Sequence, residues 1–248
     1  MLEALGSLMI FAHRGASAHA PENTWAAFQR ALDDRARALE YDVKLSLDGQ
    51  VVVIHDQTID RTTDGHGKVN ELTLAQLKAV DAGRWFDSTF RGERIPTLDE
   101  VFATFGHKIF MNVELTNYAS PFDQLVPKVA LLIKKHNLGE HILLSSFFPH
   151  NLSTCRRLLP QVPRGLLAFP SFKGGIQRFL GRFMDLQAEH PFTSDVTVKS
   201  VASAHDLGRK VFVYTVNDPA EMRRLCEAGV DGLFTDDPAL VLRTLDMK

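Results

Sequence analysis

The sequence predicts an α/β protein of the (β/α)8 class, a single TIM barrel spanning residues 1–248 with a small insertion after the second strand, at about residues 56–97. Three observations favour this fold. The chain has 248 residues, and one such barrel typically has about 250. Short apolar runs alternate with helical patterns along the whole chain, which is typical of parallel βαβ units. About eight units follow one another without a linker, which favours a closed barrel over a doubly wound sheet.

The expected strands are short runs of apolar and β-branched residues, a composition that favours strands. In chain order they are Leu8–Ala12, Leu39–Leu45, Val51–Ile54, Ile109–Leu115, Ile142–Ser145, Gly165–Ala168, Val211–Val216 and Gly232–Thr235. The helical patterns between them often begin at a proline, which suits the first turn of a helix. They are Glu22–Asp33 (with Asn23 or Thr24 near its N-cap), about Pro121–His136, a helix from Pro149, one from Pro219 to Ala228 and one from Pro238.

Two segments break this rhythm. Residues 56–97 contain R-T-T-D-G-H-G and G-R-W-F around one short helical pattern, and are expected to form the insertion. The stretch Phe169–Phe183 holds Pro170, Gly174 and Gly175 among several phenylalanines. Because glycine and proline favour turns, we expect this stretch to be a mobile loop with an amphipathic turn.

Composition and charge exclude some classes of partner. The net charge is −2, from 28 basic and 30 acidic residues, which argues against a nucleic-acid-binding surface but permits a small anionic substrate. Cys155 and Cys226 lie in no C-x-x-C pattern, and are expected to be free thiols. The first apolar run is too short for a signal segment or a membrane span. We therefore expect a cytoplasmic protein without stable membrane insertion, with a homo-oligomer left open.

Three acidic residues are placed where a cation could bind. Glu40 and Asp42 lie two apart on an expected strand, so their side chains share one face. Glu114 lies near the end of the apolar run M-N-V-E-L, and barrel active sites lie at the carboxyl ends of strands. Converging carboxylates are costly unless a cation lies between them, and oxygen ligands suit Mg²⁺ or Ca²⁺. The alternative for each acid is an exposed or salt-bridged position at the rim.

Two histidines and an arginine have similar positions. His13 and His55 each follow an expected strand, in H-R-G and H-D. Beside a metal site they could act as an acid/base pair near neutral pH. Arg14 follows His13, and its guanidinium matches phosphate oxygens, although it could also pair with Glu22 and brace the loop.

The residues above belong to a longer set of short motifs: H-R-G (His13–Gly15), P-E-N-T (Pro21–Thr24), E-Y-D (Glu40–Asp42), H-D (His55 and Asp56), R-T-T-D-G-H-G (Arg61–Gly67), V-E-L (Val113–Leu115), S-S-F (Ser145–Phe147), Y-T-V-N (Tyr214–Asn217) and V-D-G-L-F-T-D (Val230–Asp236). Together these motifs resemble the glycerophosphodiester phosphodiesterase family. They occur in order from His13 to Pro238, nearly the whole chain. Each motif alone is weak, but the ordered combination is highly specific.

The resemblance implies a (β/α)8 barrel that binds one divalent cation, Mg²⁺ or Ca²⁺, through Glu40, Asp42 and Glu114. It also implies that His13 and His55 are the general acid and base and that Arg14 binds phosphate. The implied reaction converts glycerophosphodiesters to glycerol 3-phosphate and an alcohol. Attack on phosphorus could come from a neighbouring glycerol hydroxyl, through a cyclic phosphate, or directly from water.

Two positions depart from the family pattern. Thr116 stands where the family usually has lysine, and Tyr214 where many relatives have tryptophan. Lys44 alternates in phase with Glu40 and Asp42, so it could replace the missing lysine. Two other functions remain open: a related phosphodiesterase or lyase acting on lysophospholipid-like substrates, and a catalytically silent barrel that binds a phosphorylated ligand.

Overall fold

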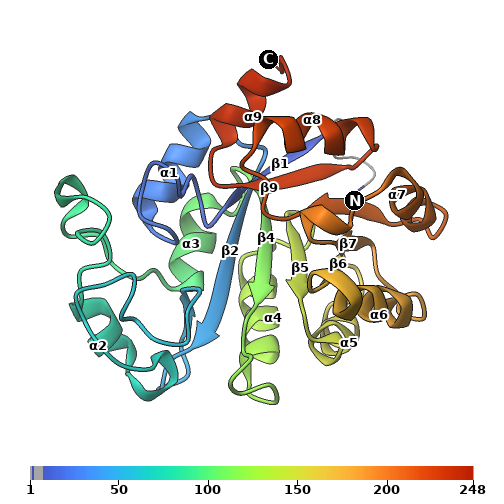
Figure 1. Cartoon of the computed structure of the whole chain (residues 1–248). Coiled ribbons are helices and arrows are strands. Elements are labelled where there is room, and N and C mark those ends of the chain that lie inside the picture. Colours follow the sequence, from blue (N-terminus) through green and yellow to red (C-terminus); the bar gives the residue numbers. More distant parts are fainter. Residues whose placement is uncertain (1, 3–7, 248) are drawn as a thin grey trace.

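The computed structural model describes residue 2 and residues 8–247. Over these residues, eight parallel strands close into a ring in the order β1, β2, β4, β5, β6, β7, β8, β9 and back to β1 (Figure 1). Their bounds are β1 (Met9–His13), β2 (Ala38–Leu45), β4 (Phe110–Leu115), β5 (Ile142–Ser146), β6 (Arg164–Leu167), β7 (Ala188–His190), β8 (Lys210–Val213) and β9 (Gly232–Thr235). The predicted barrel is thus confirmed.

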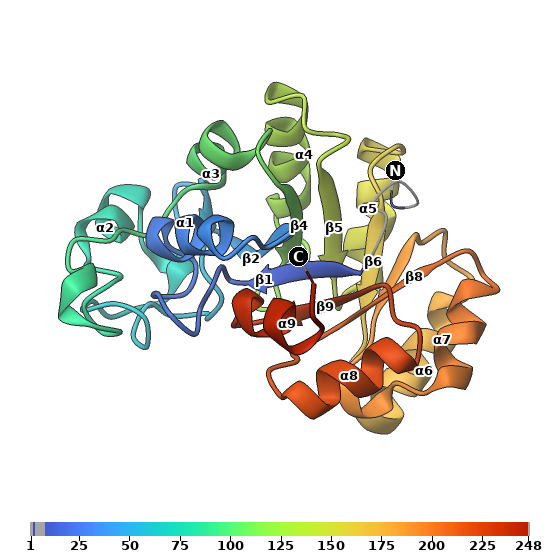
Figure 2. The same ribbon diagram turned by 90° about the horizontal axis from the view of Figure 1, so that it is seen from above.

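Helices lie on the outside of the ring; all but the last connect successive strands, and the last follows β9. They are α1 (Trp25–Asp33), α3 (Leu98–Phe105), α4 (Leu125–Lys135), α5 (Pro149–Leu158), α6 (Ser171–Gly181), α7 (Val198–His205), α8 (Pro219–Glu227) and α9 (Pro238–Thr244). Seen from above, α3 and α4 cover one side of the ring, and α6, α7 and α8 cover the other (Figure 2). Thr24 is the N-cap of α1 and accepts a hydrogen bond from the Ala27 amide, which satisfies one of the amides left free at a helix start.

Strand β3 (Val51–Val53) does not belong to the ring. It pairs antiparallel with the end of β2, with Val53 opposite Val43. The chain then forms the 3₁₀ turn η2 (Val69–Glu71), α2 (Leu74–Ala79) and the 3₁₀ turn η3 (Ser88–Phe90) before it enters α3. This segment lies at one side of the barrel, beyond α1 and α3 (Figure 1), and has a small apolar cluster of its own that includes Ile59 and Leu77.

The expectation of a mobile loop over Phe169–Phe183 is wrong, because most of that stretch is α6. Glycine normally weakens a helix, but here Gly174 packs directly on the backbone of Phe169, whose carbonyl oxygen would lie 1.7 Å from an added Cβ. Helix α7 was not among the expected elements, and β7 was not among the expected strands, although a short strand-like stretch precedes Pro191 in the sequence. Two of the three residues of β7 are the polar Glu189 and His190, so it lacks an apolar run.

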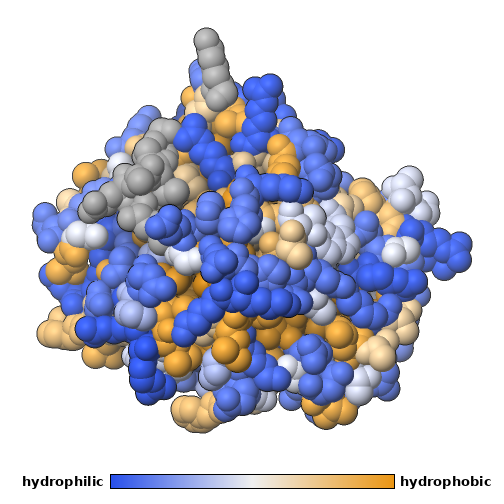
Figure 3. Space-filling model, turned by 180° about the vertical axis from the view of Figure 1, so that it is seen from behind, coloured by the Kyte–Doolittle hydropathy of each residue, from blue (hydrophilic) through white to orange (hydrophobic). Residues whose placement is uncertain are grey.

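The interior of the barrel is apolar at the amino ends of the strands and polar at their carboxyl ends. The ring of Phe11 stacks on Phe234 at 4.6 Å and lies 4.9 Å from that of Phe212, and the three rings belong to one apolar cluster inside the barrel. On the outside, the face opposite to that of Figure 1 is largely hydrophilic, with hydrophobic residues showing between hydrophilic ones (Figure 3). Within the part of the chain that the structure describes, every helix is too short or too polar to cross a bilayer.

Candidate active site

Three carboxylates meet at the carboxyl ends of neighbouring strands. Strand β2 supplies Glu40 and Asp42 to the barrel interior, and the β2–β4 register sets Asp42 opposite Glu114. One carboxylate oxygen from each residue lies within 4.8 Å of the others. Glu40 and Asp42 are only 3% and 1% exposed, so water cannot screen their repulsion well. The structure therefore brings together the three acids expected to bind a metal.

The pKa values of these acids are governed by burial and by the charges of their neighbours. Burial, with the charges of Asp42 and Glu114, raises the pKa of Glu40 well above its usual range. Burial and the charge of Asp42 raise the pKa of Glu114 to about 7. Burial also acts on Asp42, but Arg14 and neighbouring bases outweigh it and lower that pKa. A cation placed among the three oxygens would favour the charged form of both glutamates, and an all-oxygen donor set fits Mg²⁺ or Ca²⁺.

His13 lies at the end of β1, with one ring nitrogen held by a carboxylate. Its Nδ1 lies 2.6 Å from Oδ1 of Asp236, and the other oxygen of Asp236 accepts a 2.6 Å hydrogen bond from Asn217. Because a carboxylate accepts, Nδ1 carries the proton and Nε2 is left for chemistry in the pocket. The side chain is 20% exposed, so a substrate can reach it.

His55 reaches the same pocket by a different route. Strand β2 runs past the barrel rim, and β3 returns antiparallel along that extension, so the Ile54 amide donates to the Asp42 carbonyl at 3.0 Å. His55 therefore arrives level with the carboxylates. Its Nδ1 lies 2.7 Å from Oδ1 of Asp56, which again leaves Nε2 free of that contact. Both histidines thus have a carboxylate partner on Nδ1, an arrangement that fixes the tautomer and orients the ring.

Arg14 adopts a left-handed conformation, with φ of 57°, which is uncommon for a residue other than glycine and is often found at functional sites. In this conformation its amide donates to Glu40 at 3.1 Å. Its guanidinium donates to Glu22 at 2.9 Å and lies 3.4 Å from Asp42. Arg14 thus braces the loop, as one of the two expected roles requires, while it also lines the pocket with Glu40 and His55.

A chain of ion pairs links Arg14 to His55. Arg61, from the insertion, holds both oxygens of Glu22 at 2.7 and 2.8 Å. The same guanidinium donates to Asp56, the partner of His55, at 2.7 Å. Arg61 is the central residue of these ion pairs. Through it, the position of Arg14 is coupled to that of His55.

A cavity of about 280 Å³ joins these groups. Its polar side is formed by His13, Arg14, Glu40, His55, Asn112 and Glu114. Its apolar side is formed by Phe147, Leu167, Phe192, Tyr214 and Phe234. A pocket that is charged on one side and aromatic on the other suits a small molecule with an anionic centre and a less polar substituent.

Sequence reasoning missed the groups that support this site. Asp56 and Asp236 appeared only as parts of motifs, although each holds a histidine. Tyr118 lies in none of the motifs, yet its hydroxyl donates to Glu114 at 2.6 Å. The proximity of Asp56 to His55 was a usable signal, because the two are adjacent. The pairing of His13 with Asp236 spans 223 positions, and only the closure of the barrel between β1 and β9 reveals it.

His190 lies at the wall of the same pocket and is completely buried. Among the described residues, no hydrogen-bond partner reaches either of its ring nitrogens. Burial lowers the pKa of His190 to about 3, so it stays neutral in the folded protein at neutral pH. The isolated side chain titrates near pH 6.5, and the two values together make the fold sensitive to acid.

We expect His190 to destabilise the fold as pH falls below about 6.5, because the unfolded chain then binds a proton that the folded chain does not. Above that pH its contribution is constant. Between pH 6.5 and 3 the loss grows by about 1.4 kcal/mol per pH unit. Urea unfolding of wild type and His190→Gln across this range measures the difference. Equal pH dependence in the two proteins would contradict the prediction.

Lys44 lies beside Thr116, the position that departs from the family pattern. Its Nζ donates to the Thr116 carbonyl at 2.8 Å and to the Thr116 hydroxyl at 2.7 Å. Burial lowers the pKa of Lys44 to about 8, although Asp42 and Glu114 act to raise it. The structure thus places an ammonium group next to residue 116, close to the carboxylate cluster.

Comparisons with known proteins give the same class. Residues 13–240 match the model of the Glycerophosphoryl diester phosphodiesterase family. The chain is 39% identical to a glycerophosphodiester phosphodiesterase of Caldanaerobacter subterraneus subsp. tengcongensis, over 94% of this chain and 96% of that protein.

Solved structures are similar over almost the full length. A phosphodiesterase of Oleispira antarctica, determined in complex with the product sn-glycerol-3-phosphate, is 32% identical, with a TM-score of 0.85 and 99% of both chains covered. A glycerophosphodiester phosphodiesterase of Agrobacterium tumefaciens is 28% identical, with a TM-score of 0.78 over 95% of this chain and 99% of that one.

Proposed function

Because this chain belongs to the glycerophosphoryl diester phosphodiesterase family and is an enzyme of that class, we propose that it cleaves glycerophosphodiesters to glycerol 3-phosphate and an alcohol with a divalent cation, Mg²⁺ or Ca²⁺. The observation that carries the proposal is the meeting of three carboxylates and two carboxylate-held histidines at one pocket. The sn-glycerol-3-phosphate bound to the Oleispira antarctica protein supports the product.

Glu40, Asp42 and Glu114 are the residues that would hold the cation, which supplies positive charge to neutralise the phosphate as charge develops on it. Arg14 would donate to a phosphate oxygen from the same side of the pocket. Because Glu22 and Asp42 already fix its guanidinium, little side-chain freedom would be lost on binding.

His13 and His55 would move the protons. One imidazole takes the proton from the attacking hydroxyl, and the other gives a proton to the oxygen of the leaving alcohol. Asp236 and Asp56 hold the Nδ1 atoms, so the exchange takes place at Nε2. The attacking group is either water or a neighbouring glycerol hydroxyl. Attack by the hydroxyl gives a cyclic phosphate, which water then opens to glycerol 3-phosphate with the roles of the two histidines reversed. A diester without a neighbouring hydroxyl distinguishes them: its full turnover would exclude the cyclic route.

The direct test is release of glycerol 3-phosphate from glycerophosphocholine, measured with Mg²⁺, with Ca²⁺ and with EDTA. We expect activity with at least one cation and its loss in EDTA, because the buried acids need a positive charge to act together. Glycerophosphoethanolamine is assayed as a second substrate, so that an enzyme that does not accept the choline head group is still detected. Turnover that is unaffected by EDTA would contradict the metal dependence.

Lys44 should assist the reaction, because its ammonium group lies beside Thr116, the position where the family usually has lysine. We expect Lys44→Met to lower kcat/KM by about 10- to 100-fold, the range that loss of one hydrogen bond to a charged group gives. Lys68→Met is the matched control, since Lys68 pairs with Glu71 on the surface of the insertion. An unchanged kcat/KM in Lys44→Met would remove Lys44 from the site.

A further inference from the structure

Helix α6 turns its apolar face to the solvent. Phe172, Ile176, Phe179, Leu180 and Phe183 are 80%, 46%, 60%, 59% and 81% exposed. The first four lie in α6, and their spacing of i, i+4, i+7 and i+8 places them on one stripe of a helix with 3.6 residues per turn; Phe183 follows in the turn after α6. A contiguous stripe of large apolar side chains on a surface marks an interaction site rather than ordinary scatter.

The opposite face of α6 explains this orientation. Gly174 and Gly181 are the buried residues of the helix, and a Cβ on Gly181 would lie 2.7 Å from the Leu166 side chain. The helix therefore packs on the barrel through glycines, at close range. An ordinary barrel helix buries its apolar stripe against the sheet, whereas α6 leaves its stripe unpartnered.

The charged residues of the segment that carries the stripe are all basic. Residues 169–184 contain Lys173, Arg178 and Arg182 and no aspartate or glutamate. Arg178 lies 3.9 Å from Asp195. In the described part of the chain, Lys173 and Arg182 form no ion pair. An exposed apolar stripe flanked by basic residues is the pattern of a helix that lies in the interface of an anionic membrane, which makes a lipid surface a better match than an acidic or neutral protein surface.

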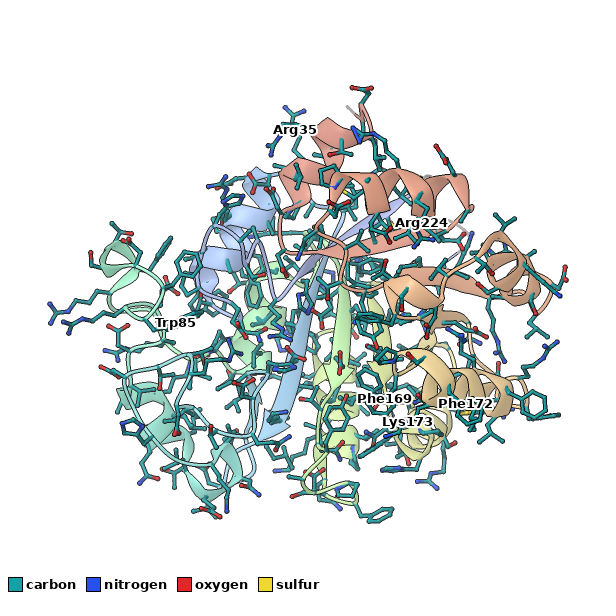
Figure 4. The ribbon with its side chains drawn as sticks, in the orientation of Figure 1. Arg35, Trp85, Phe169, Phe172, Lys173 and Arg224 are labelled. Carbon is teal, nitrogen blue, oxygen red and sulfur yellow. The ribbon has the colours of Figure 1, made fainter. Side chains whose placement is uncertain are left out.

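The stripe is continuous with the mouth of the catalytic pocket. The ring of Phe169, 44% exposed, stacks on Phe147 at 4.4 Å. Phe147 lines the pocket and meets Tyr214 edge to face at 6.0 Å. Phe169, Phe172 and Lys173 lie near one another at the start of α6 (Figure 4). A surface that covers α6 would therefore lie beside the opening of the pocket.

We propose that α6 docks the protein reversibly on the surface of an anionic phospholipid membrane, with its phenylalanines among the acyl chains and Lys173 and Arg182 at the phosphate groups. Such a helix lies on the membrane and does not span it. The docking places the catalytic pocket next to the lipid surface. It does not depend on the proposed hydrolysis, because binding is measured without substrate.

The test is co-sedimentation of the full chain with vesicles of phosphatidylcholine and phosphatidylglycerol in equal parts, compared with pure phosphatidylcholine, at low salt. We expect clear binding to the anionic vesicles, weaker binding to the neutral ones and release by salt. Lys173→Gln with Arg182→Gln should weaken anionic binding about 25-fold, since each basic residue contributes about fivefold. The triple variant Phe172→Ser, Phe179→Ser, Phe183→Ser should lose at least about tenfold on both surfaces.

Leu131→Ser is the matched control, because Leu131 is a 66% exposed apolar residue on α4, and it should bind like wild type. Thermal melts confirm that each variant is folded. Wild-type protein that fails to bind anionic vesicles overturns the proposal, as does equal binding by the triple variant. Sedimentation velocity without lipid tests whether the stripe binds a second copy of the chain instead. If wild type forms a dimer, the triple variant is a monomer and wild type does not bind vesicles, the stripe is a dimer interface. That result also overturns the proposal of membrane docking.

Discussion

Replacing His13 with alanine should lower kcat for glycerol 3-phosphate release by roughly 10²–10⁴-fold, the usual contribution of one general acid or base. The fold should persist, because His13 contributes one hydrogen bond at the end of β1 and is partly exposed. KM should change less than kcat, because the imidazole acts in the proton-transfer step, whereas the phosphate is bound by other groups. Single-turnover and steady-state assays on glycerophosphocholine measure both parameters.

His66→Ala is the control for this experiment, because His66 lies in the insertion with its side chain 86% exposed. It should retain wild-type kcat. His55→Ala should resemble His13→Ala, as the two imidazoles serve the same reaction from opposite ends. If His13→Ala keeps wild-type kcat, the proton transfer assigned to it is wrong, whatever the effect at His55.

Replacing Glu114 with glutamine should abolish the stabilisation of the protein by metal. A cation at 100 times its Kd raises the free energy of unfolding by about 2.7 kcal/mol, which corresponds to an increase in Tm of about 5–10 °C for a chain of this size. Glutamine keeps the size of the side chain and an oxygen for the Tyr118 hydroxyl, but loses the charge. Melting curves with Mg²⁺, Ca²⁺ and EDTA measure the effect without any substrate.

The same variant should melt at or above wild type in EDTA, because one of three crowded carboxylates is then uncharged. Glu71→Gln is the matched control, since Glu71 is 62% exposed and pairs with Lys68, and its metal-induced shift should equal that of wild type. A full shift in Glu114→Gln would show that the cation binds elsewhere.

Local pattern was sufficient for most of the fold. Apolar runs and prolines at helix starts located the barrel strands except β7, as well as the helices that begin at Pro149, Pro219 and Pro238. The period of two along β2 was enough to set Glu40 and Asp42 on one face, because that alternation is a property of the strand itself. Where a strand was short and polar, as in β7, or a helix was rich in glycine, as in α6, local pattern failed.

Contacts between segments that are distant in the sequence were decided only by the tertiary structure. The antiparallel return of β3 brings His55 level with Asp42, and Arg61 of the insertion ties Arg14 to His55. The sequence by itself determined the family, the barrel and the residues that carry charge, because motifs and periodicity are local. The pairing of Asp236 with His13 depends on closure of the ring between β1 and β9. The outward apolar face of α6 depends on which face of the helix packs on the barrel. Both are decided by the packing of the whole chain, because they join residues that are far apart in the sequence.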